Sequence, residues 1–144
     1  MKVKQILVPF DGSENSFRSL EYALDLAKQC GASVIGLHVF TDLSGFEAVH
    51  PLIIKEEKWP NNVRHLMEDA RKIAGKQAKV SYKEIVIGGK SEGNDIVTFA
   101  NSKSNHIDLI VIGHRGLSLP KEIILGSTAH FVLHKSQTPV LIIK

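Results

Sequence analysis

Three glycines near the C-terminal end of the chain, with two hydroxyl residues, have a spacing that suits phosphate binding. Two residues separate Gly113 from Gly116, nine more follow, and Gly126 then stands directly before Ser127 and Thr128. Glycines let a backbone turn tightly and approach a ligand, because they carry no Cβ. The start of a helix favours an anion through its free N–H groups and its dipole. The hydroxyls can donate to phosphate oxygens, so a phosphate chain is the predicted ligand.

Other roles for this segment stay open. Glycines between a strand and a helix can serve tight packing alone, and Ser127 can act as the N-cap of the following helix. Arg115 lies between the first two glycines, where its guanidinium can pair with phosphates or point to solvent. The segment contains no evident general base, so no catalytic residue is predicted.

Asp11 is a candidate ligand-binding residue at the other end of the chain. It follows a predicted first strand, beside the point where a doubly wound sheet reverses its strand order and where ligands bind in such folds. Its alternative role is to form a turn or to cap the first helix, which Ser13 could also do. Pro9 is expected to shape the same turn.

The elements that must position these residues alternate along the chain. Runs rich in β-branched residues predict strands at residues 4–8, 33–40, 80–87, 109–112 and 140–143. A 3.6-residue apolar period predicts helices at residues 13–30, 62–77, 93–102 and 127–136. Several strands are apolar at consecutive positions, which is typical of a parallel sheet buried on both faces. We therefore predict an α/β fold: an open doubly wound five-stranded parallel sheet with helices on both faces.

Residues 41–60 do not fit this alternation. Pro51 and Pro60 bracket a mixed stretch that contains Trp59. The stretch is expected either to pass over the carboxyl edge of the sheet as a mobile loop or to extend the second helix. A lid, a partner surface and a spacer are all possible roles.

Composition sets further limits. The chain has 144 residues, of which 43% are hydrophobic and 23% charged, as expected for one globular domain at residues 1–144. The net charge of +3 is modest and the lysines are scattered, so neither nucleic acid nor a membrane is an expected partner. Cys30 is the single cysteine, which indicates a reducing, cytoplasmic setting. It is expected to be a small core residue or a residue at a helix end.

Two patterns look more specific than they are. The sequence GGKS at residues 88–91 is similar to the end of a P-loop, but Glu84 stands where the P-loop requires a further glycine. His130 and His134 have metal-ligand spacing on a predicted helix, yet no glutamate follows His130. A turn and a solvated helix face are the preferred interpretations, and no metal site is predicted.

The glycine segment and both ends of the chain resemble the universal stress protein family in its ATP-binding form. The spacing of Gly113, Gly116, Gly126 and Ser127 matches that family's G-x-x-G, nine residues, G-[S/T] pattern. The opening ILVPFDGS at residues 6–13 is similar to its first strand and acidic turn, and the closing TPVLII at residues 138–143 to its last strand. The resemblance covers the chain except residues 41–60.

The resemblance implies an adenine nucleotide alpha hydrolase-like fold with strand order 3-2-1-4-5. It implies that ATP is the ligand, with or without Mg²⁺, that Asp11 faces the nucleoside, and that the backbone of Val39 meets the adenine. It also implies a homodimer through the closing strand, whose apolar edge would otherwise be exposed. The implied function is a nucleotide-dependent stress or signalling role with slow or no hydrolysis. A weak Mg²⁺-dependent ATPase or autokinase, and a partner-binding protein with a vestigial pocket, are the alternatives.

Overall fold

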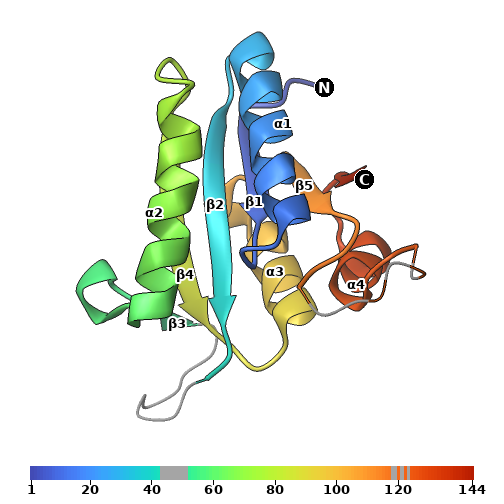
Figure 1. Ribbon diagram of the computed structural model, residues 1–144. Coiled ribbons are helices and arrows are strands. Elements are labelled where there is room, and N and C mark those ends of the chain that lie inside the picture. The colour runs from blue at the N-terminus through green and yellow to red at the C-terminus, as the bar shows by residue number, and fades with distance from the viewer. Residues whose placement is uncertain (43–51, 118–119, 121, 123) are drawn as a thin grey trace.

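A mixed six-stranded sheet lies between two layers of helices in the computed structural model (Figure 1), which describes residues 1–42, 52–117, 120, 122 and 124–144. The strands are β1 (Gln5–Pro9), β2 (Ser33–Phe40), β3 (Leu52–Ile53), β4 (Tyr82–Gly88), β5 (Leu109–Gly113) and β6 (Val140–Ile143). The helices are α1 (Glu14–Cys30), α2 (Asn61–Gly75), α3 (Glu92–Asn101) and α4 (Ser127–Lys135), with 3₁₀ turns at Glu56–Lys58 and Lys103–Asn105.

The strand order is β3-β4-β2-β1-β5-β6. The five strands that the sequence predicts are parallel and keep the predicted order, 3-2-1-4-5 when counted without β3. The prediction of a purely parallel five-stranded sheet needs one correction. β3 is a sixth strand, antiparallel to β4, and pairs Leu52 with Gly88 and Ile53 with Ile87. Two residues are too few to give a strand pattern in a sequence.

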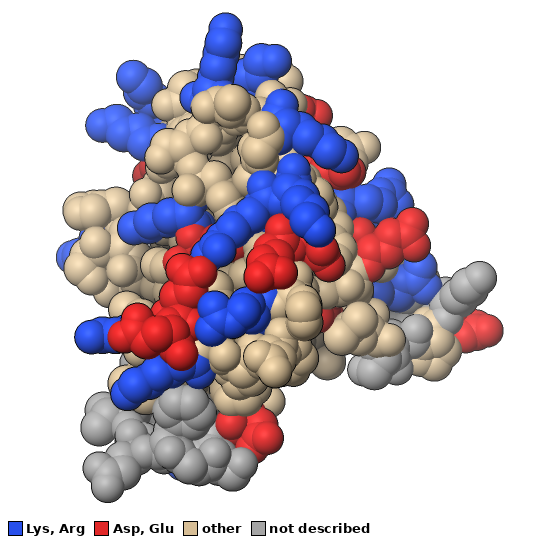
Figure 2. Space-filling view, turned by 60° about the vertical axis from the view of Figure 1, so that its left-hand side comes forward, with Lys and Arg blue, Asp and Glu red and all other residues tan. Residues whose placement is uncertain are grey.

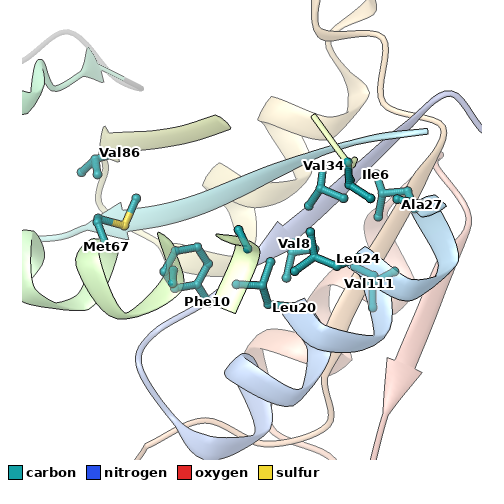
Figure 3. Packing of buried hydrophobic residues seen from close by; sticks show 14 of the residues in the cluster. Ile6, Val8, Phe10, Leu20, Leu24, Ala27, Val34, Met67, Val86 and Val111 are labelled. Atoms are coloured by element: carbon teal, nitrogen blue, oxygen red, sulfur yellow. The ribbon is translucent and has the colours of Figure 1, made fainter. Parts of the chain in front are cut away.

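The two faces of the sheet carry separate hydrophobic cores. Ile6 and Leu7 are neighbours on β1, both fully buried, and they lie in opposite clusters. On one face, α1 packs Leu20 and Leu24 against Val8 (Figure 3). α3 and α4 cover the other face (Figure 1). Burying one such side chain contributes roughly 1.5–3 kcal/mol, so the consecutive apolar positions of these strands stabilise both layers.

Both ends of α1 have identifiable caps. Ser13 is the N-cap, and its side chain accepts a hydrogen bond of 3.2 Å from the N–H of Ser16. Gly31 ends the helix in a left-handed conformation, with φ of 69°, as its type predicts. Cys30, the last residue of α1, is exposed. Of its two expected positions, the helix end is therefore the correct one.

Residues 52–60 form part of the folded body beside β4. The N–H of Ile54 donates to the carbonyl of Val86 at 2.8 Å, and the indole N–H of buried Trp59 donates to the carbonyl of Ile54 at 2.8 Å. Because α2 begins at Asn61, these residues are not an early extension of that helix. The earlier part of the segment, residues 43–51, lies outside the described residues.

Charges of both signs cover the α2 side of the molecule. Figure 2 shows Lys and Arg side chains beside Asp and Glu side chains over much of this face. Arg71 of α2, for example, forms ion pairs with Glu56 and with Glu84 of β4. Within the described part of the chain, no helix has the length and apolar character needed to cross a membrane.

Candidate functional site

A pocket of about 300 Å³ opens where β1 and β5 end and α4 begins. β1 is the central strand from which the chain winds to β2 on one side and, later, to β5 on the other, so the pocket lies at the topological switch point of the sheet. The structure brings all but one of the predicted site residues into its walls. They are Pro9, Asp11, Gly113, Arg115, Gly116, Gly126, Ser127 and Thr128.

Asp11 connects the first turn to the glycine segment. One carboxylate oxygen accepts a hydrogen bond from the N–H of Ser13 at 2.9 Å, and the other accepts one from the N–H of Leu117 at 3.1 Å. The first bond is the turn-forming role that the sequence left open. The second bond spans the pocket wall, so the Asp11 carboxylate also fixes the position of the loop that follows β5.

Gly116 is required by the space beside Asp11. A Cβ at this position would lie 2.5 Å from Oδ2 of Asp11, closer than side chains normally approach. Its φ is not positive, because the positive-φ glycines among the described residues are Gly12 and Gly31. A close approach rather than an unusual backbone conformation therefore explains the glycine.

Gly113 has a packing role at the end of β5. A Cβ there would meet the backbone carbon and oxygen of Asn15 in α1, each at 3.1 Å. For this one glycine, the structure supports the packing alternative that the sequence left open. Gly113 also lines the pocket, so its close contact with α1 sets the width of the pocket at that point.

The first turn of α4 lines the pocket and contains backbone donors that have no acceptor among the described residues. Gly126 is the N-cap, and no side chain in the described part of the chain caps this helix. The alternative that Ser127 is the N-cap is therefore excluded, because Ser127 is the first residue inside the helix. The first helical hydrogen bond runs from the N–H of His130 to the carbonyl of Gly126. The N–H groups of residues 127–129 precede it and have no intrahelical acceptor.

Gly126 itself offers less to a ligand than its position suggests. Its N–H donates to the carbonyl of His114 at 2.6 Å, so it is already used within the protein. Its φ of −69° and ψ of 157° are extended backbone that any residue adopts. Gly126 thus anchors the start of α4 to the glycine loop.

Arg115 is held at the pocket wall by its neighbour. Its Nε donates to Nε2 of His114 at 2.9 Å, and Nδ1 of His114 contacts the carbonyl of Ile143 at 3.1 Å. The N–H of His114 also donates to that carbonyl, at 2.8 Å. Two contacts therefore connect the glycine loop to β6, and the half-buried Arg115 side chain lines the pocket.

Glu92, the first residue of α3, is a pocket residue that the sequence analysis missed. Burial raises the pKa of its carboxyl, the Asp11 carboxylate raises it further, and the Thr128 hydroxyl partly offsets both effects. An acidic residue in the first turn of a helix is common because it complements the dipole. Its type and place in the sequence therefore gave no sign that it enters a pocket formed by other elements.

Val39 lies near the end of β2 and is not among the described pocket-lining residues. β1 pairs with β2 only as far as Leu37, whose carbonyl accepts a hydrogen bond from the N–H of Phe10. Alternate residues of a strand direct their backbone groups to the same side. The N–H and C=O of Val39 therefore point beyond the end of β1, and their contact with a base remains a prediction.

The GGKS sequence at residues 88–91 and the pair of His130 and His134 were not expected to bind a ligand. Oδ2 of Asp95 accepts a hydrogen bond from the N–H of Ser91 at 3.0 Å, and Gly89 leaves room for this buried carboxylate. The GGKS sequence is thus the turn that leads into α3. His130 and His134 are exposed, with ring centroids 4.4 Å apart. Within the described ranges, no group of three His, Cys, Asp or Glu side chains is placed to hold a metal ion.

The fold and the site define an α/β protein with a glycine-bordered pocket at the switch point of a doubly wound sheet. The family model of the universal stress proteins matches residues 2–144. The chain belongs to the universal stress protein family.

Individual relatives are similar over nearly the whole chain. Universal stress protein YxiE of Bacillus subtilis is 32% identical over 151 residues, which cover 97% of this chain and 98% of YxiE. The solved structure of MJ0577, a universal stress protein of Methanocaldococcus jannaschii, has a TM-score of 0.77 at 26% identity and covers 100% of this chain and 97% of its own. A universal stress protein solved in complex with cAMP has a TM-score of 0.73 at 23% identity and covers 100% of this chain and 98% of its own. That last likeness concerns the fold.

Proposed function

We propose that the pocket binds an adenine nucleotide, with ATP as the natural ligand, and that the protein has a nucleotide-dependent role in stress or signalling. The observation that carries this proposal is the set of N–H groups at residues 127–129, which have no acceptor among the described residues and belong to the helix start that lines the same pocket as Gly116. Such a helix start suits phosphate oxygens, because its donors and its dipole both favour negative charge. Family membership agrees with this assignment.

The two ends of the pocket suit different parts of a nucleotide. The start of α4, with the hydroxyls of Ser127 and Thr128, is the proposed phosphate end, and Arg115 is placed to pair with a phosphate. Asp11 and the backbone of Val39 are the proposed nucleoside end, because the backbone groups of Val39 that point beyond the end of β1 can recognise the edge of a base. Mg²⁺, if bound, would enter with the phosphates and neutralise part of their charge.

Isothermal titration calorimetry with the purified protein tests this proposal. ATP, ADP, AMP and cyclic AMP are the ligands, and GTP is the control for the base. We expect saturable binding of adenine nucleotides and weaker binding of GTP. No heat from any adenine nucleotide at millimolar concentration would favour the alternative of a partner-binding protein with a vestigial pocket.

A weak Mg²⁺-dependent ATPase or autokinase is the second candidate, and Glu92 is the observation that favours it. A carboxylate with a raised pKa in the phosphate end of a pocket is a reasonable proton acceptor for an attacking water. Thin-layer analysis of ATP after hours with the protein and Mg²⁺ decides between binding and turnover. ADP formation that disappears in Glu92→Gln would support the enzyme, and intact ATP would support a binding protein.

A homodimer through β6 and a cytoplasmic location belong to the same proposal. β6 is the edge strand of the sheet, and Leu141 on it is 41% exposed. An apolar exposed edge invites pairing with a second chain. Antiparallel pairing of two β6 strands would cover both edges, and sedimentation velocity at tens of micromolar measures the outcome.

A further inference from the structure

Glu92 lies at the proposed phosphate end of the pocket because α3 packs closely against α4. Gly93, the next residue of α3, allows this approach, since a Cβ there would lie 3.0 Å from the ring of Phe131 in α4. The close packing places Glu92 in the wall of the same pocket as Ser127 and Thr128, which lie in the first turn of α4. A carboxylate of the protein therefore shares the pocket with a helix start that suits an anion.

The charge of the pocket makes this arrangement significant. Among the described residues that line it, Asp11 and Glu92 are acidic, and Arg115 is the one basic residue. Two carboxylates against one guanidinium leave a formal excess of one negative charge. A site that only attracted polyphosphate would need the opposite balance, because like charges in a partly buried pocket repel strongly.

We propose that Glu92 is a specificity-determining residue whose carboxylate repels nucleotide phosphate at the start of α4. The inference rests on the proposed function of the same pocket. A phosphate bound at the start of α4 must accept this repulsion or displace the Glu92 side chain. Glu92 therefore weakens the binding of nucleotides according to the negative charge that they carry at this end of the pocket.

This role predicts a graded effect along a series of ligands. Adenosine has no phosphate, so its binding affinity should not depend on the charge of Glu92. AMP carries less negative charge than ATP, so its binding is weakened less. Mg²⁺ neutralises part of the triphosphate charge, which reduces the difference between ATP and AMP. The protein thus discriminates in favour of the Mg²⁺ complex of ATP over free ATP.

Calorimetric titration of adenosine, AMP and ATP, at pH 8 with a chelator present, tests the inference. The variants are Glu92→Gln, which keeps the shape and removes the charge, and Glu21→Gln, which removes one charge from an exposed position on α1. Glu92→Gln is expected to bind free ATP about tenfold more tightly, which corresponds to about 1.4 kcal/mol. Its affinity for adenosine should stay within about twofold, and Glu21→Gln should match the wild type for all three ligands.

Unchanged or weaker ATP binding by folded Glu92→Gln, with adenosine binding intact, would overturn the repulsion while leaving nucleotide binding in place. Failure of wild type and Glu92→Gln to bind any of the three ligands would overturn the proposed function and this inference together.

Discussion

Replacing Gly116 by alanine tests the geometry of the glycine loop most sharply. The new Cβ would lie 2.5 Å from Oδ2 of Asp11, whereas ordinary van der Waals contacts begin at 3.4 Å. The carboxylate or the loop must therefore move by roughly 0.9 Å, the difference between the two distances. The hydrogen bond of 3.1 Å between that oxygen and the N–H of Leu117 would not survive such a shift.

The size of the effect follows from the lost hydrogen bond. A hydrogen bond to a charged group contributes about 1.5–3 kcal/mol. If its loss releases the loop from its binding position, ATP affinity falls by roughly tenfold to a hundredfold, at about 1.4 kcal/mol per factor of ten. The same loss should lower the thermal midpoint by roughly 3–12 °C without abolishing folding, because the cores on both faces of the sheet are untouched.

Calorimetry with ATP and a thermal melt of the same samples measure both effects. Gly75→Ala is the matched control: Gly75 is the last residue of α2, and a Cβ there meets no atom within 4 Å. This control should bind ATP normally and gain about 0.4–1 kcal/mol of stability. If folded Gly116→Ala binds ATP within about twofold of the wild type, the assigned role of the Asp11–Leu117 contact is wrong.

Three further predictions concern packing, assembly and pH. Gly113→Ala should cost about 1–3 kcal/mol of stability in urea denaturation, because its Cβ meets the Asn15 backbone at 3.1 Å; unchanged stability would contradict that contact. Leu141→Lys should convert a dimer to a monomer in sedimentation velocity if β6 strands pair, and a dimer that persists refutes that interface. Burial lowers the pKa of His38, with the Phe10 carbonyl and Asp11 acting against it. The unfolded chain therefore takes up a proton below about pH 6.5 that the folded chain does not, so stability falls as pH drops through that value, by at most about 1.4 kcal/mol per unit, and His38→Gln should reduce this slope.

The sequence predicted most of the sheet because its strands carry a strong local signal. Strands such as β5 and β6 are apolar at consecutive positions, and each is followed or preceded by a helix with its own period and end signals. β3 was missed because it is defined by pairing with β4, which lies far along the chain, and not by its two residues. Gly113 and Gly116 line the pocket as the sequence suggested, but the close contacts that call for glycine, with Asn15 and Asp11, depend on tertiary packing.

The site shows the same division between local and long-range information. The family resemblance and the expected switch point of the sheet predicted that Asp11 and the glycine segment lie at one site. Glu92 could not be found in this way, since only the packing of α3 on α4, through Gly93, directs it toward Thr128. The role of Gly126 also depends on tertiary structure, because its N–H donates to the carbonyl of His114. Donors next to it, at residues 127–129, carry the proposed function instead.

An amide-detected NMR titration with ATP tests the central claim most directly, because it reports on each backbone N–H separately. If the phosphates bind at the start of α4, the largest shifts occur at residues 127–129 and at Leu117, with smaller shifts near Asp11 and Val39. Unchanged amides at saturating ATP would contradict this binding site. Shifts that gather instead at the cavity between α2 and β4, which Trp59 and Glu84 line, would contradict it as well.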